Sequence, residues 1–303
     1  MRILVTGASG LLGLNFCLKM AKSHDITGII HRNALKDVPF RCVQTDLTEP
    51  NILQGLIANY QPQLVLNCAA MADVEVCERH PEQAKRLNAE MPGELASICE
   101  EKKIKMVHIS TDAVFDGRKG NYCEEDEPNP LSVYASSKLA GEKNVMLINT
   151  QALVVRTNFY GFSISGRHSL AEFFLKHLLK RKEVNGFVDV IFCPLYVADL
   201  TETLMQMVYK NLSGLYHVVS PECLSKYEFG VNIAKIFGCD PALVRPLSVA
   251  QSGLTAPRPP RLDLNIGKLQ SEKIVPPAQA EGLEHFYQDY QAGLPERIKS
   301  CAL

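Results

Sequence analysis

The first 160 residues alternate short apolar runs with longer segments in which apolar residues recur at helical spacing. This alternation constrains the fold more than any other feature, because short apolar runs that end near glycine or small polar residues are typical of buried strands. The expected strands are 2–7, 26–31, 63–70, 104–111 and 152–158, and the expected helices are 10–23, 51–60, 82–103 and 129–149. Apolar strands separated by helices form a parallel sheet covered on both faces. The sequence therefore predicts an α/β fold with a doubly wound parallel sheet.

The remaining chain shows a less regular pattern. Helical patterns occupy 169–182, 195–210 and 225–238, a strand is expected at 214–220, and 255–269 is a loop rich in proline and arginine. We expect residues 1–160 to form the main domain, completed by a returning segment at about 190–212. Residues 161–303 are expected to form a smaller C-terminal lobe that rests on this domain.

Composition excludes several classes of protein. The chain has 32 basic and 33 acidic residues, so no polycationic surface indicates a nucleic-acid partner. No stretch reaches the roughly 20 apolar residues that a membrane span needs, and the first apolar run is too short for a secretory signal. The ten cysteines contain no CxxC pair and are expected to be reduced, and the eight histidines form no metal-binding pattern. We therefore expect a cytoplasmic globular protein with no membrane partner and no metal.

A glycine-rich loop, "VTGASGLLG", joins the first expected strand to the first expected helix. Gly7 can form the tight turn, Gly10 lets the backbone approach a pyrophosphate, and Gly13 lets the helix pack on the strand. The helix N-terminus then offers free N–H groups and the positive end of its dipole to phosphates. The loop therefore indicates a dinucleotide site in a Rossmann-type domain.

The end of the second strand, "IIHRN", bears on the choice of dinucleotide. NAD-binding proteins usually carry an acidic residue about 20 positions after the glycine loop, and residues 31–33 contain none. Arg32 can instead bind the 2′-phosphate of NADP. Asp46, which follows a short strand, is placed either to accept from the adenine amino group or to cap the next helix. NADPH is therefore the expected cofactor, with NADH as the alternative.

Tyr134 and Lys138 lie four residues apart in "VYASSKLAGE". The expected helix at 129–149, with Asn129 as its cap and Pro130 at its first position, would place both side chains on one face. The spacing alone is weak evidence, because Lys138 can equally pair with Glu142 one turn further on. The two readings are a catalytic pair and a solvated helix face.

The motifs together resemble the extended short-chain dehydrogenase/reductases. They are the glycine loop at 7–13, "NCAA" at 67–70, "STDAVFDG" at 110–117 and "YASSK" at 134–138. Within this superfamily the chain is most similar to the dTDP-4-dehydrorhamnose reductase family, through "RTNFYG", "CPLYVADL" and "RPPRLDLNIGKL" as well. The resemblance implies NADPH-dependent reduction of a nucleotide-activated 4-keto-6-deoxy sugar for polysaccharide synthesis. It is compatible with a homodimer.

The resemblance also assigns roles to residues. Tyr134 would donate a proton to the carbonyl oxygen, Thr111 would hydrogen-bond this oxygen, and Lys138 would lower the pKa of Tyr134 and hold the nicotinamide ribose. The implied cofactor contacts are Gly7, Ser9, Gly10, Leu11, Leu12, Gly13, Arg32, Asp46, Leu47, Ala69, Ala70, Met71, Tyr134 and Lys138. The implied substrate contacts are Thr111, Asp112 and Arg258, with Arg258 either binding the substrate diphosphate or serving as an ordinary loop residue.

Two positions depart from the family pattern. Ala113 stands where an aromatic residue usually lines the sugar pocket, Met71 stands where Tyr or His is common, and the chain has no tryptophan. A dehydratase would carry a glutamate in place of Ala113, so dehydration is disfavoured. An NAD-dependent 4-epimerase and a non-catalytic, dinucleotide-binding regulatory subunit remain as alternatives.

Overall fold

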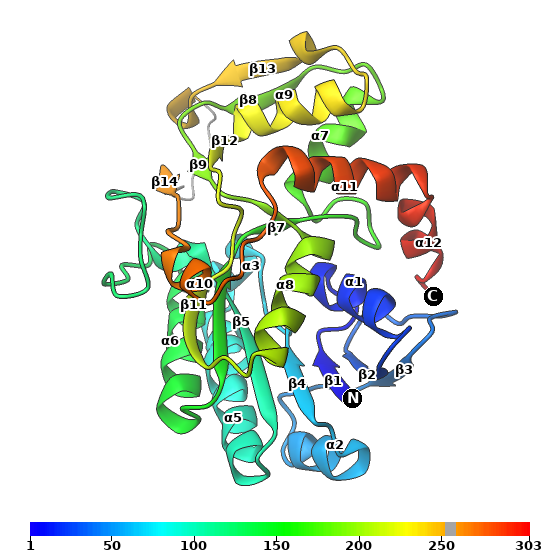
Figure 1. The fold of residues 1–303 in the computed structure, drawn as a ribbon, viewed down its shortest axis with the longest axis vertical. Coiled ribbons are helices and arrows are strands. Elements are labelled where there is room, and N and C mark those ends of the chain that lie inside the picture. Colours follow the sequence, from blue (N-terminus) through cyan, green and yellow to red (C-terminus); the bar gives the residue numbers. More distant parts are fainter. Residues whose placement is uncertain (252–258) are drawn as a thin grey trace.

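The fold is built on one seven-stranded parallel sheet (Figure 1). The computed structural model describes residues 1–251 and 259–303. The strands lie in the order β11-β6-β5-β4-β1-β2-β3, and every neighbouring pair is parallel. They are β1 (Arg2–Thr6), β2 (Asp25–Ile30), β3 (Arg41–Gln44), β4 (Leu64–Asn67), β5 (Lys105–Thr111), β6 (Leu153–Thr157) and β11 (Gly214–His217). The strand order reverses between β1 and β4, which is where ligands bind in sheets of this kind. The predicted doubly wound α/β fold is confirmed.

Helices cover both faces of this sheet, each over its own apolar cluster. One cluster packs α1 (Leu11–Met20) and α8 (Val197–Tyr209) against the sheet, and the other packs α2 (Ile52–Tyr60), α5 (Met91–Glu101) and α6 (Val133–Ile148) against the opposite face. Burial of both faces explains why the strands read as continuous apolar runs. Short helices α3 (Val74–Arg79) and α4 (Pro81–Lys85) precede α5, and a π-helical segment, η1 (Arg86–Glu90), interrupts what the sequence predicted as one helix at 82–103.

The second part of the chain forms a smaller lobe beyond the carboxyl ends of the sheet strands (Figure 1). Its helices are α7 (Leu170–Leu178), α9 (Lys226–Ile236), α11 (Gln279–Gln291) and α12 (Leu294–Ser300). Its short strands are β7 (Phe159–Tyr160), β8 (Val184–Phe187), β9 (Ile191–Phe192), β10 (Leu195–Tyr196), β12 (Leu224–Ser225), β13 (Val244–Leu247) and β14 (Arg261–Leu262). Ser169 with Glu172, and Ser225 with Glu228, form capping boxes that begin α7 and α9.

The main sheet gains a strand from the second half of the chain. Strand β11, which follows α8, pairs with β6 and extends the sheet by one strand. Helix α10 (Gly267–Ser271) also contacts β11. The strand expected at 214–220 therefore belongs to the main sheet and not to the smaller lobe.

The start of α6 differs from the prediction. Ser132 is its N-cap, and the Ser132 hydroxyl accepts a hydrogen bond from the Ala135 N–H at 3.2 Å. Asn129 instead donates from its side chain to the Asp116 carboxylate at 3.0 Å. The expected cap at Asn129 is wrong because this tertiary hydrogen bond holds the residue outside the helix.

One pair of cysteines is oxidised. Cys193 and Cys223, separated by 30 residues, form a disulfide bond, so the expectation that all ten cysteines are reduced is wrong for this pair. The Gln279 amide donates to the carbonyl of Pro194 at 2.7 Å and to that of Glu222 at 3.1 Å, next to each cysteine. No short motif marks the pair, because the fold alone brings the two segments together.

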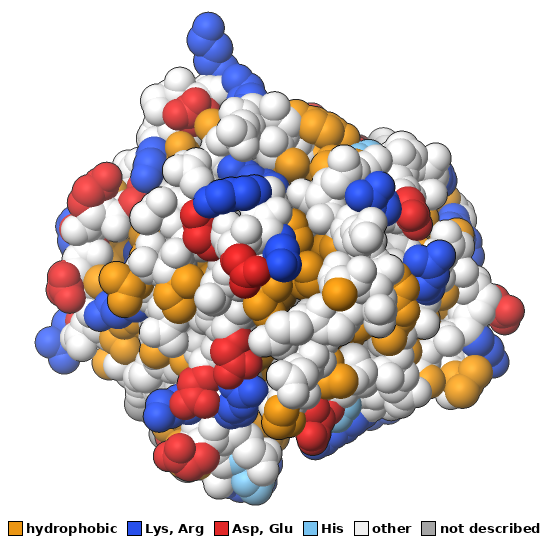
Figure 2. Space-filling view, turned by 90° about the horizontal axis from the view of Figure 1, so that it is seen from below, with side chains coloured by type: hydrophobic (Ala, Val, Ile, Leu, Met, Phe, Trp, Pro, Cys, Tyr) orange, Lys and Arg blue, Asp and Glu red, His pale blue; other side chains and the backbone are white. Residues whose placement is uncertain are grey.

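Charge is mixed on the molecular surface. On the face shown in Figure 2, basic and acidic side chains lie among apolar and neutral ones. Within residues 1–251 and 259–303, no group of three His, Cys, Asp or Glu side chains is placed to hold a metal ion. Among the helices of the same described residues, none is long and apolar enough to cross a membrane.

A buried ion pair holds α6 on the sheet. Glu142 on α6 and Arg156 on β6 lie 2.8 Å apart, with side chains 0% and 3% exposed, and the Ser110 hydroxyl donates to Glu142 at 2.5 Å. The Arg156 guanidinium also lies over the Phe115 ring, 4.9 Å from its centroid. This pair sets the position of α6 relative to β5 and β6, and with it the position of every side chain that α6 carries toward the sheet.

Replacing Arg156 with methionine should cost about 3–5 kcal/mol in the free energy of unfolding, because Glu142 would remain buried without its cation. Urea denaturation measures this loss. Arg245→Met is the matched control, since Arg245 pairs with Glu183 where both side chains are more than half exposed, and it should change stability little. Equal small effects of the two substitutions would contradict a structural role for the buried pair.

Candidate active site

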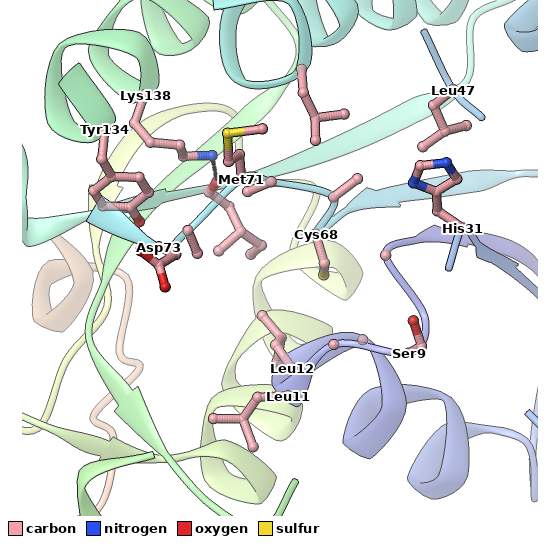
Figure 3. Close-up of a pocket in the computed structure, with 18 of the residues that line it drawn as sticks. Ser9, Leu11, Leu12, His31, Leu47, Cys68, Met71, Asp73, Tyr134 and Lys138 are labelled. Carbon is pink, nitrogen blue, oxygen red and sulfur yellow. Dashed lines mark hydrogen bonds between the residues drawn. The ribbon is translucent and has the colours of Figure 1, made fainter. Parts of the chain in front are cut away.

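A cavity of about 1260 Å³ opens at the carboxyl ends of the sheet strands. It is large enough for a dinucleotide together with a second ligand, since pockets for small ligands usually measure about 300–1,000 Å³. All but one of the residues that the sequence assigned to the site line this cavity: Gly7, Ser9, Gly10, Leu11, Leu12, Gly13, Arg32, Asp46, Leu47, Ala69, Ala70, Met71, Thr111, Asp112, Tyr134 and Lys138. The exception, Arg258, lies outside the described residues. Figure 3 shows that Tyr134 and Lys138 lie at one end and His31 and Leu47 at the other.

The glycine loop forms the floor between these two ends. Gly7 has φ +67°, and a Cβ at this position would lie 2.8 Å from the Ala69 nitrogen. A Cβ at Gly13 would overlap the Gly7 carbonyl oxygen. Only glycine at position 13 therefore allows α1 to approach the loop this closely. Gly10 is the N-cap of α1 and provides no side-chain hydrogen bond, which leaves the first N–H groups of the helix free for an anion. The loop therefore fits a pyrophosphate.

The far end of the cavity carries Arg32 and Asp46. Arg32 is exposed and contributes to the wall. Asp46 accepts hydrogen bonds from the Thr48 backbone at 2.9 Å and from the Thr48 hydroxyl at 2.7 Å, which lower its pKa, and the charges of His31 and Arg32 lower it further. Because the N-cap of α2 is Asn51, Asp46 does not cap that helix. Of the two roles expected for Asp46, contact with a ligand remains.

Lys138 reaches from α6 to the end of β5. Its ammonium group donates to the Ile109 carbonyl at 2.6 Å (Figure 3). Burial lowers the pKa of Lys138 to about 8, although the Glu142 carboxylate raises it. Lys138 is buried and faces the sheet, so the reading of this residue as part of a solvated helix face is wrong.

Tyr134 lies in the cavity wall one helical turn before Lys138. Burial raises the pKa of Tyr134 to about 12, a hydrogen bond with Thr111 lowers it, and the Asp112 charge raises it. The expectation that Lys138 lowers this pKa is therefore wrong for the structure. Loss of hydration outweighs other effects, and the ammonium group is directed to a backbone carbonyl.

Asp112 extends the polar end of the cavity. It is 3% exposed, and it accepts hydrogen bonds from the Asn158 amide at 2.7 Å and from the Thr111 hydroxyl at 3.2 Å. Burial raises the pKa of Asp112 to about 6, while these hydrogen bonds lower it. Thr111, Asp112 and Tyr134 thus form a connected polar group beside Lys138, at the end of the cavity opposite Arg32.

Comparison with known proteins identifies the family to which the chain belongs. The model of the RmlD substrate binding domain family matches residues 1–292, nearly the whole chain. The chain belongs to this family.

Several curated relatives are similar to this chain over most of their length. A probable low-salt glycan biosynthesis reductase from Haloferax volcanii is 33% identical over 275 residues, covering 88% of this chain and 91% of the relative. A dTDP-4-dehydrorhamnose reductase from Mycobacterium tuberculosis is 33% identical over 268 residues, covering 85% and 82%. The methionine adenosyltransferase 2 subunit beta of Danio rerio is 30% identical over 279 residues, covering 89% and 84%.

Solved structures of the family share the fold. The dTDP-4-dehydrorhamnose reductase of Clostridium acetobutylicum has a TM-score of 0.83 and 27% identity, covering 96% of this chain and 100% of the other. The dTDP-4-dehydrorhamnose reductase of Bacillus anthracis, solved in complex with NADP, has a TM-score of 0.80 and 27% identity, covering 95% and 99%. The resemblance to extended short-chain dehydrogenase/reductases is confirmed.

Three residues at or next to this cavity were not indicated by any sequence pattern. Asn88, in the π-helical segment, accepts from the Met71 N–H at 2.8 Å and donates to the Met71 carbonyl and the Ser137 hydroxyl at 3.0 Å each. It joins the segment after β4 to α6. Arg167 and His168, from the loop before α7, line the cavity directly, whereas Asn88 acts through Met71, which lines it. These residues lie outside the recognised motifs, so only the fold reveals them.

Thr157 was also missed. It ends β6 opposite Thr111, is 3% exposed and lines the cavity. Its hydroxyl has no hydrogen-bond partner within the described parts of the chain. A buried hydroxyl of this kind is available to a bound ligand. Its place in "RTNFYG" is the one sequence signal that pointed to it.

Asp112→Asn should increase stability at neutral pH by about 1–3 kcal/mol and by less as the pH falls. The pKa of Asp112 is about 6 when folded against 3.8 for the free side chain. Because the folded pKa is the higher one, the native state loses stability as the pH rises through this range. Asparagine keeps an acceptor for Asn158 and does not titrate. Denaturation of both proteins from pH 4 to pH 7.5 measures the difference.

Asp126→Asn is the control of opposite sign. The Lys119 ammonium holds the pKa of Asp126 at about 2, so its charge stabilises the fold above about pH 4, and the substitution should destabilise it there. A difference between wild type and Asp112→Asn that stays constant with pH would show that Asp112 does not titrate in this range.

Proposed function

We propose that this protein reduces a nucleotide-activated 4-keto-6-deoxy sugar with NADPH. The observation that carries the proposal is one cavity in which the glycine loop of α1 faces a polar group formed by Thr111, Tyr134 and Lys138. The names of the relatives support it, since one is a dTDP-4-dehydrorhamnose reductase at 33% identity and another is a glycan biosynthesis reductase.

The cavity fits the cofactor in three places. The free N–H groups of α1 and the close backbone at Gly7 suit a pyrophosphate, and Arg32 supplies a cation where the 2′-phosphate of NADP would lie. At its other end the same cavity is lined by Lys138, which would hold the nicotinamide ribose. The Bacillus anthracis relative, solved in complex with NADP, supports this choice of dinucleotide over NAD. When bound, the nicotinamide supplies the hydride that reduces the carbonyl carbon.

Tyr134 supplies the proton in this proposal. With a pKa of about 12 its phenol keeps its proton at neutral pH, as a general acid must. The phenol would donate to the carbonyl oxygen as the hydride reaches the carbon, which leaves a hydroxyl on the sugar and a tyrosinate to be reprotonated from solvent. The Thr111 hydroxyl, which donates to Asp112 in this structure, would turn to donate a second hydrogen bond to the same oxygen. Lys138 is positively charged below about pH 8, and its ammonium group, which donates to the Ile109 carbonyl, would hold the nicotinamide ribose beside the reacting carbonyl.

Substrate recognition falls to the smaller lobe in this proposal. Residues 1–160 with the returning segment would bind the cofactor, and the rest of 161–303 would bind the sugar nucleotide, with Asp112 at the boundary and Arg258 as a contact for its diphosphate. Met71, held by Asn88, lines the cavity beside the sugar position. An apolar side chain at Met71 would favour a substrate face that carries a methyl group or hydrogen over one that carries a hydroxyl.

A regulatory role is the second candidate. The methionine adenosyltransferase subunit beta of Danio rerio is nearly as similar to this chain as the reductases are, which favours considering a partner protein. The two functions make different demands on Tyr134. A reductase needs its hydroxyl, whereas a regulatory subunit needs at most its contribution to packing.

Tyr134→Phe should lower the turnover number by about 10²–10⁴-fold, because the phenol is the proton source. The measurement is NADPH oxidation, followed by absorbance, with dTDP-, UDP- and GDP-linked 4-keto-6-deoxy sugars. Tyr209→Phe is the control, since Tyr209 is 64% exposed at the end of α8, and it should leave the rate unchanged.

The binding of NADPH to Tyr134→Phe, measured by titration calorimetry, separates a chemical role from a structural one. Retained binding with lost turnover supports the proton-donor role. If the wild-type protein binds NADPH and reduces no sugar of the panel, the reductase proposal fails and the regulatory role becomes the better account.

A further inference from the structure

We propose that residues 301–303, which follow α12, set the preference for NADPH over NADH by fixing the backbone that carries Arg32. This inference deepens the proposed function and rests on its assignment of Arg32 to the 2′-phosphate. Residues 301–303 are called the 301–303 segment below. It is far from Arg32 in the sequence, and the fold brings it next to the connection between β2 and β3 (Figure 1).

The contact is a short antiparallel pairing of two backbone segments. The Lys36 N–H donates to the Cys301 carbonyl at 2.9 Å, and the Leu303 N–H donates to the Ala34 carbonyl at 3.3 Å. Leu35 and Ala302 face each other between these two bonds. The pairing thus begins two residues after Arg32 and depends on backbone groups, so the side chains at positions 36 and 303 can be changed without removing it.

The 301–303 segment is itself held by the core. Cys301 is 6% exposed and Ile298, on α12, is fully buried. Helix α12 follows α11, whose Phe286 is also fully buried and stacks on Phe162 at 4.3 Å between ring centroids. A segment supported in this way presents its carbonyl and N–H groups in fixed positions. The 301–303 segment can therefore restrain the irregular connection between β2 and β3.

Arg32 lies between two restraints. On one side the Gln44 side chain donates to the His31 carbonyl at 2.8 Å, and on the other the pairing begins at Ala34. The arginine side chain lines the cavity near Asp46, whose pKa its charge lowers. A guanidinium binds phosphate best when its backbone is already in place, because less conformational entropy is then lost on binding.

The pairing should therefore affect the binding of one group of the dinucleotide, the 2′-phosphate. The 2′-phosphate is present in NADP(H) and absent from NAD(H), and the two dinucleotides are otherwise chemically the same. Loosening the connection between β2 and β3 should weaken NADP⁺ binding while leaving NAD⁺ binding nearly unchanged. A general loss of structure would weaken both.

Leu303→Pro removes the N–H that donates to Ala34, and Leu303→Ala is the matched control because it keeps this N–H and Leu303 is 83% exposed. Lys36→Pro and Lys36→Ala form a second pair at the other hydrogen bond. Arg32→Ala measures the whole contribution of the guanidinium. Titration calorimetry with NADP⁺ and NAD⁺ gives both dissociation constants for each protein, and hydrogen exchange reports the mobility of residues 33–36.

We expect Arg32→Ala to weaken NADP⁺ binding by about tenfold or more, as for the loss of a charge-assisted hydrogen bond. Each proline variant should weaken it about threefold to tenfold relative to its alanine control and speed hydrogen exchange at 33–36, with NAD⁺ binding within about twofold of the control. Equal NADP⁺ affinity in the proline and alanine variants, or equal loss for both dinucleotides, would overturn the inference.

The same data separate this inference from the proposed function. Binding is measured without a sugar, so the role of the 301–303 segment can hold even if no sugar is reduced. If Arg32→Ala leaves NADP⁺ binding unchanged, the assignment of Arg32 to the 2′-phosphate fails, and the role of the 301–303 segment fails with it.

Discussion

The buried ion pair of Glu142 and Arg156 is the interaction on which the geometry of the site depends. It joins α6 to β6, and the Ser110 hydroxyl joins the same carboxylate to β5. Lys138 lies one turn before Glu142 and Tyr134 one turn before that, so a helix held at Glu142 presents both to the carboxyl ends of the strands. An ion pair in this position adds little stability over apolar packing, but its hydrogen bonds tie the helix to both β5 and β6 at Glu142.

Burial is the main influence on the ionisable groups of the cavity. It raises the pKa of Tyr134 and Asp112 and lowers that of Lys138, and in each case it is the largest cause. A tyrosine in such surroundings keeps its proton and can give it to a substrate that excludes the remaining water. The glycine loop at the other end works through backbone N–H groups, whose partial charges do not titrate. In the function proposed here, the site would combine a proton source at one end with a fixed anion site at the other.

Much of the main domain could be predicted because the patterns that indicate it lie in short, continuous stretches of the sequence. Each sheet strand reads as an apolar run, and the glycine loop and "YASSK" lie in continuous stretches. The failures share a cause. Asn129 was predicted as a cap and instead binds Asp116, Cys193 pairs with Cys223 without a motif, and β11 joins the main sheet from the second half of the chain. These are contacts between distant segments, which local patterns do not encode.

The sequence by itself determined the parallel α/β fold, the position of the dinucleotide loop and the candidate residues Thr111, Tyr134 and Lys138. All three depend on the periodicity of apolar residues and on residue types at short spacing, which are local properties of the sequence. Only the tertiary structure decided how the residues meet and how they ionise: Lys138 turns to the Ile109 carbonyl, and the 301–303 segment reaches the connection that carries Arg32. Solvent exclusion and long-range backbone pairing exist only once the chain has folded.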